Sequence, residues 1–112
     1  MDSNDILLAY KSGVKTCKQI EQGHEHMKGQ HELMFKAWQE KSKPLLTEDE
    51  KLISDCNEAL LTFKQVLEIA ENKTEAPSAD YEKIHDRFRM IVTRHKNLKD
   101  EHESFFHEMM GH

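Results

Sequence analysis

Apolar side chains recur at alternating intervals of three and four residues along most of this chain, and this spacing constrains the fold more than any other feature. A period near 3.5 gathers side chains on one face of an α-helix, and helices with such faces pack at a shallow angle around a shared seam. No stretch alternates with the period of two that indicates a strand, and the 112 residues include only 4 Gly and 2 Pro. The spacing therefore predicts an all-α fold.

The first interruption of the pattern lies around residues 43–50. Pro44 disfavours helical geometry at the residue before it. Thr47 and Glu50 have the spacing of a capping box, in which the Thr hydroxyl bonds the amide of residue 50 and the Glu carboxylate bonds the Thr amide. We expect a first helix over about residues 3–42, capped by Asp2 or Ser3, and a second that begins at about residue 48.

The second interruption is the stretch 73–78, which contains the other proline and predicts a loop. Ser78 is placed to cap a third helix, which Gly111 would end. The expected helices thus cover about 3–42, 48–72 and 79–110. Because short connections make neighbouring helices antiparallel, we predict an elongated up-down-up three-helix bundle with a coiled-coil-like seam, forming one domain over residues 1–112.

Three glycines, Gly13, Gly23 and Gly29, lie inside the first expected helix, and each costs about 1 kcal/mol relative to alanine. A break near Gly23 would give a four-helix bundle instead. The seam passes through all three glycines without losing phase, which favours one helix. Gly13 lies on the seam, where it either permits close approach of another helix or is an ordinary small residue at a crowded point.

The chain has 8 His, and four of them lie on the seam. An offset of 71 residues aligns the first and third helices, which run in the same direction in this topology. That offset places His24 beside His95 and His31 beside His102. Polar residues at such positions lower stability but fix the register and the choice of helix partners.

A turn near Pro44 also predicts the register of the middle helix. It pairs His24 with Leu60, His31 with Ile53, and Cys17 with Leu67. Cys56 then lies near residue 28, about 16 Å along the axis from Cys17. A disulfide needs Cα atoms within about 7 Å, so this register predicts free thiols.

The seam histidines admit three interpretations. The first is a half-buried, register-setting layer. The second is a metal site, with the four seam histidines as ligands, although the two His layers lie about 10.5 Å apart, which is too far for one ion. The third is a pH-responsive core, since burial disfavours the charged form of His. If the histidines only set the register, we expect no metal and no cofactor. The metal-ligand set of the second is His24, His31, His95 and His102.

Several function classes are disfavoured by composition and motifs. The net charge of −5 weakens any diffuse attraction to nucleic acid. No apolar run reaches the length of about 18–20 residues of a membrane span, and the N-terminus does not resemble a secretory signal. With two isolated cysteines, this predicts a cytoplasmic protein. No P-loop, nucleophile elbow, HExxH or dinucleotide fingerprint occurs, so we expect no enzyme and assign no catalytic residue.

On these grounds we expect the protein to act by protein–protein interaction, as an adaptor, chaperone or inhibitor-type regulator that acts through helix faces. The partner would be another protein, bound by a monomer or a homodimer, and not nucleic acid or a membrane. The alternative is a histidine-based metal-binding or metal- or pH-sensing bundle. Apolar residues off the seam, or flanking it, are candidates for the binding surface: Leu7, Val14, Phe35, Leu61, Ile69, Met90 and Met110, with Leu8 and Leu33 as further candidates.

Overall fold

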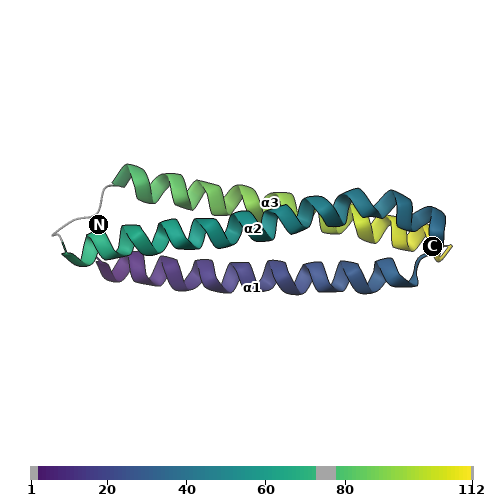
Figure 1. Ribbon diagram of the computed structural model, residues 1–112, viewed down its shortest axis with the longest axis horizontal. Coiled ribbons are helices and arrows are strands. Elements are labelled where there is room, and N and C mark those ends of the chain that lie inside the picture. Colours follow the sequence, from purple (N-terminus) through teal and green to yellow (C-terminus); the bar gives the residue numbers. More distant parts are fainter. Residues whose placement is uncertain (1–2, 73–77, 112) are drawn as a thin grey trace.

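The structure, a computed structural model, describes residues 3–72 and 78–111 and contains three helices in that part of the chain. These are α1 (Ser3–Leu33), α2 (Lys36–Asn72) and α3 (Ser78–Met109). Figure 1 shows them side by side along a body with extents of 58 × 20 × 18 Å, and each pair of helices is in contact. The predicted all-α, up-down-up three-helix bundle is confirmed.

The turn between α1 and α2 lies at residues 34–35, not near Pro44 as predicted. The carbonyl of Phe35 accepts the amides of Trp38 and Gln39, both at 2.9 Å, which starts α2. The carbonyl of His31, in the last turn of α1, accepts the backbone amide of Met34 at 3.1 Å and the side-chain amide of Gln39 at 3.2 Å. The first helix is therefore shorter, and the second longer, than the predicted 3–42 and 48–72.

Pro44 lies inside α2 on its exposed face. An interior proline costs about 3 kcal/mol, because it lacks an amide proton and its ring crowds the preceding turn. Burial of the neighbouring Ser42 and Leu45 on the inner face of α2 offsets this cost. The predicted capping box is also wrong: Thr47 is inside the helix, and its hydroxyl donates to the carbonyl of Lys43 at 3.1 Å.

Moving the turn changes the register of α2 against α1 by eleven residues. His24 contacts Asp49 instead of the predicted Leu60, and His31 contacts Ser42 instead of Ile53. Eleven residues are about three helical turns, so the same face of α2 points inward in either register. The pattern of apolar residues therefore predicted the buried face but not the register.

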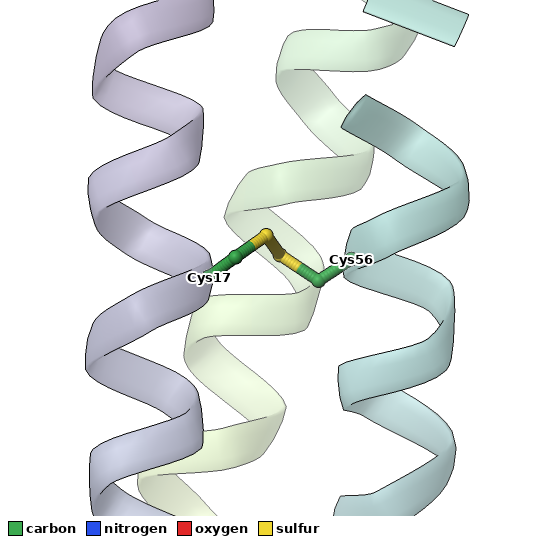
Figure 2. Close-up of a disulfide and its surroundings, with 2 residues drawn as sticks. All are labelled: Cys17 and Cys56. Carbon is green, nitrogen blue, oxygen red and sulfur yellow. A yellow bond between two sulfur atoms is a disulfide. The ribbon is translucent and has the colours of Figure 1, made fainter. Parts of the chain in front are cut away.

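The new register brings Cys17 and Cys56 together. Their Cα atoms are 5.9 Å apart and their sulfurs form a disulfide, which joins α1 to α2 with α3 behind it (Figure 2). The predicted free thiols are wrong, because that prediction placed Cys17 opposite Leu67.

The disulfide lies within an apolar cluster that fills the half of the bundle opposite the α1–α2 turn. Phe63 is at its centre, with ring centroids 6.2 Å from Tyr10, 5.9 Å from Tyr81 and 5.8 Å from Phe88. A Cβ added to Gly13 would lie 3.1 Å from the Phe88 ring, so this glycine does permit close helix approach. No helix in the described parts of the chain is long and apolar enough to cross a membrane.

α1 continues through Gly23 without interruption, so the four-helix alternative is wrong. α3 begins at Ser78, one residue before the predicted 79, and ends at Met109. Gly111 follows with a φ of 83°, the left-handed conformation that commonly ends a helix, as predicted. The predicted cap at Asp2 and most of the predicted loop at 73–78 lie outside the described residues.

Candidate functional site

A buried carboxylate connects all three helices near the middle of the bundle. Asp49 of α2 is fully buried, and His24 of α1 and His95 of α3 are 5% and 9% exposed. The Nδ1 atom of His24 lies 2.8 Å from Oδ2 of Asp49, and Nδ1 of His95 lies 2.5 Å from Oδ1. An ionised carboxylate only accepts hydrogen bonds, so both imidazoles donate through Nδ1. We call these three residues the His–Asp–His layer.

Gly23 makes room for this layer. A Cβ at this position would lie 2.5 Å from Nε2 of His95, closer than real side chains approach. The absence of a side chain on α1 thus lets the imidazole of α3 reach Asp49. On the other side of the layer, Nε2 of His24 lies 3.7 Å from a carboxylate oxygen of Glu50, which is largely exposed. Glu50 therefore lies at the solvent edge of the layer on the His24 side.

A second polar layer lies closer to the α1–α2 turn. His31 pairs through Nδ1 with the hydroxyl of Ser42, which donates onward to the carbonyl of Gln39 at 3.2 Å. His102 of α3 is fully buried, and its Nδ1 is 3.1 Å from Oε1 of Gln30. The His31 and His102 rings are 6.3 Å apart between centroids. The predicted 71-residue offset thus brings both pairs of seam histidines to common layers.

The other ring nitrogen of His102, Nε2, is buried and has no hydrogen-bond partner. The pKa of His102 is lowered from 6.5 to about 4, mainly by burial and in the same direction by the neighbouring His31, His26 and His24. Since Nδ1 donates to Gln30, the neutral ring leaves an unprotonated Nε2 facing the interior. His102 is therefore a neutral core residue at pH 7.

The described residues do not form the ligand arrangement that the metal interpretation needs. Among residues 3–72 and 78–111, no group of three or more His, Cys, Asp or Glu side chains is placed to hold a metal ion. In the His–Asp–His layer, each Nδ1 is directed at a carboxylate oxygen at hydrogen-bond distance, which leaves no space for an ion between them. His31 and His102 form a layer with an amide and a hydroxyl instead.

A different candidate lies on the surface at the end of the bundle where the α1–α2 turn meets the end of α3 (Figure 1). Leu33, Phe35 and Met110 are 72%, 71% and 55% exposed. The amide of Phe35 lies 3.2 Å from the sulfur of Met109, and the Trp38 and Phe105 rings are 6.3 Å apart. We call these exposed and half-buried residues the end patch: Leu33, Phe35, Trp38, Phe105, Met109 and Met110.

The structure divides the predicted binding surface. Phe35, Met110 and the further candidate Leu33 share the end patch, whereas Leu8, Leu61, Ile69 and Met90 are exposed at other places along the helices. Leu7 is half-buried against the apolar cluster, and Val14 is half-buried on α1. Trp38, Phe105 and Met109 continue the three-and-four spacing of the seam, and nothing in that spacing indicates that the seam opens to solvent at this end.

A shallow groove runs between α1 and α3, with a volume of about 260 Å³. Gly13, Phe63 and Phe88 form its apolar part, and His85 and Arg89 lie at its polar side. Pockets for drug-sized ligands usually measure about 300–1,000 Å³, so this groove is at most a site for a small molecule.

Comparisons with known proteins give no family for this chain: no protein-family model, curated protein or solved structure matches it. The evidence for function is therefore the arrangement of its own residues.

Proposed function

We propose that this protein acts by binding another protein, as an adaptor, chaperone or inhibitor-type regulator, and that the end patch is its binding surface. The observation that carries this proposal is that Leu33, Phe35 and Met110 are exposed at the same end of the bundle, with Leu33 and Phe35 both more than two-thirds exposed. Apolar residues scattered singly over a surface are normal, whereas adjacent ones mark interaction sites.

The composition of the end patch supports the same proposal. Aromatic residues and methionine are enriched in protein interfaces, and Trp and Tyr dominate their energetic centres. The patch contains Phe35, Trp38, Met109 and Met110, and the flexible thioethers of the two methionines can adapt to a partner surface. Lys41 lies over the Trp38 ring at 4.4 Å and provides a polar edge. In this proposal the protein binds its partner and catalyses no reaction.

A pull-down compared between two matched variants tests this proposal. Phe35→Glu places a charge in the end patch, whereas Met90→Glu places one at an exposed apolar residue of α3 outside it. Proteins captured from a lysate of the source cells by the wild type and by Met90→Glu, but not by Phe35→Glu, would support the proposal. Equal capture by all three proteins would contradict it.

We still propose a cytoplasmic location, although the disulfide removes one of the arguments for it. It depended partly on free thiols, whereas Cys17 and Cys56 are paired, and stable disulfides are typical of oxidising compartments. Trapping free thiols with an alkylating reagent in denaturant at the moment of cell lysis tests the location, because both cysteines are buried in the folded protein. Unmodified cysteines would indicate an oxidising compartment, and alkylated ones a reducing compartment.

A second candidate function, sensing of pH, is favoured by one specific observation. His102 is fully buried, its Nε2 has no partner, and its pKa is lowered to about 4. Protonation would therefore place a charge in the core and loosen the end of the bundle that carries the end patch. We propose that acidification weakens the fold there. Equal hydrogen-exchange protection of residues 98–105 at pH 7 and at pH 5 would contradict this second candidate.

A further inference from the structure

The charges around the end patch are divided by sign between its two sides. Residues 28–43, which form the α1–α2 turn and its flanks, contain four lysines and two glutamates, a net charge of +2. Residues 99–110, at the end of α3, contain one lysine and four acidic residues, a net charge of −3 with His neutral. The residues that carry these charges are exposed except for the half-buried Lys99. Lys28 pairs with Glu25 at 3.7 Å, which leaves Lys36, Lys41 and Lys43 as the other lysines of the turn and its flanks. We call the net positive turn with its flanks the basic side, and the net negative end of α3 the acidic side.

We propose that the end patch binds a second copy of this chain, so that two bundles join end to end around a two-fold axis. The inference rests on the proposed function, because it names the partner of the same surface. Most soluble homo-oligomers are two-fold dimers, in which the same surface of each subunit meets itself.

The division of charge fits such an axis. A two-fold axis that crosses the end of the bundle, between the basic and acidic sides, places the basic turn of one copy opposite the acidic α3 end of the other. This basic–acidic pairing then occurs twice, and both contacts are attractive. Complementary charges of this kind fix orientation and suppress incorrect partners. A partner of uniform charge would be attracted by one side of the patch and repelled by the other.

The apolar centre of the end patch contributes surface that would be buried between two copies. Leu33, Phe35 and Met110 would leave water when two ends meet, and each loses a large exposed surface. The backbone of Phe35 is held by the sulfur of Met109 and by the start of α2, so the turn that carries this ring is ordered before association. This pre-organisation reduces the ordering cost of association.

Sedimentation of the purified, disulfide-bonded protein over a range of concentrations tests the inference. We expect a monomer–dimer equilibrium for the wild type, a dimer with Met90→Glu, and at least about tenfold weaker association with Phe35→Glu, since tenfold is about 1.4 kcal/mol. Helical content and the disulfide should be unchanged in both variants. A wild type that stays monomeric throughout, or a Phe35→Glu protein that dimerises as well as the wild type, would overturn the inference.

A charge-reversal experiment distinguishes two-fold pairing from nonspecific hydrophobic association. Lys36→Glu with Lys43→Glu reverses the basic side, and Glu101→Lys with Glu108→Lys reverses the acidic side; the members of each pair are seven residues apart and share a helix face. Each double variant alone should remain monomeric, because like charges then meet. A mixture of the two should form a heterodimer. Failure to associate on mixing, when the wild type dimerises, contradicts the proposed orientation.

The two proposals fail in different ways. If the wild type is monomeric but the Phe35→Glu variant no longer captures a protein that the wild type captures, the inference that the partner is a second copy is wrong. The proposed function is then still supported. If Phe35→Glu changes neither association nor capture, both are wrong.

Discussion

The Nδ1 atom of His24 and the Oδ2 atom of Asp49 lie 2.8 Å apart in the interior of the bundle, and His95 holds the other oxygen of the same carboxylate. One fully buried side chain thus connects α2 to both neighbouring helices. Buried ionic groups contribute little net stability compared with apolar residues, but they are costly when a partner is removed. The His–Asp–His layer therefore selects one register among those that the apolar pattern permits.

Asp49→Ala should destabilise the fold by about 3–5 kcal/mol, because both imidazoles lose their acceptor while staying buried. Asp49→Asn should be milder, since its carbonyl still accepts from one imidazole. Urea unfolding monitored by circular dichroism measures both values. Asp55→Ala, at an exposed position of the same helix, is the control and should change stability by less than about 0.5 kcal/mol. An Asp49→Ala effect no larger than the control would show that the layer carries no structural role.

Two glycines of α1 should respond to alanine in opposite directions. Gly29→Ala should stabilise by about 1 kcal/mol, because nothing lies within 4 Å of the added Cβ and alanine favours the helix. Gly23→Ala should destabilise by about 1–3 kcal/mol, since its Cβ would displace the His95 ring from Asp49. Thermal unfolding of the two variants beside the wild type gives the comparison. A stabilised Gly23→Ala protein would mean that His95 does not need this space.

Reduction of the disulfide should lower the free energy of unfolding by about 4 kcal/mol, the chain-entropy value for residues 39 apart in sequence. Melting temperatures with and without reductant measure the effect. The Cys17→Ala/Cys56→Ala protein is the control and should melt at one temperature in both conditions. If the melting temperature of the wild type is also the same with and without reductant, the cross-link does not constrain the unfolded chain.

Stability should fall on acidification through the window set by His102. Its pKa is 6.5 when unfolded and about 4 when folded, so between these values the unfolded chain binds more protons. The stabilisation is complete above pH 6.5 and is lost as the pH falls toward 4, by at most about 3 kcal/mol. Urea titrations at several pH values measure the slope.

The variant His102→Phe removes this titration, so its stability should depend less steeply on pH between 6.5 and 4 than that of the wild type. His85→Phe changes an exposed histidine and should keep the wild-type slope. Identical slopes in all three proteins would show that His102 is not the group responsible.

Part of the candidate sites could be predicted from residue spacing alone. The 71-residue offset between the first and third helices correctly placed His24 with His95 and His31 with His102. The partner of the first pair could not be predicted, because it depends on where α2 begins. Asp49 is a seam residue in the sequence, but it faces the histidines only in the register that the turn at residues 34–35 produces.

The period of apolar residues within a single helix is enough to predict the fold class, the number of helices and their inward faces. The register depends on contacts between helices, and the Cys17–Cys56 disulfide, the His–Asp–His layer and the end patch depend on the register. A shift of three helical turns leaves the same face buried, so the local pattern cannot distinguish the two registers. α2 stays helical through Pro44, against the local preference of proline, and the neighbouring Ser42 and Leu45 are buried against the other helices. Because α2 begins before Pro44, the turn lies at residues 34–35, and the position of the turn determines which side chains of α1 and α2 are in contact.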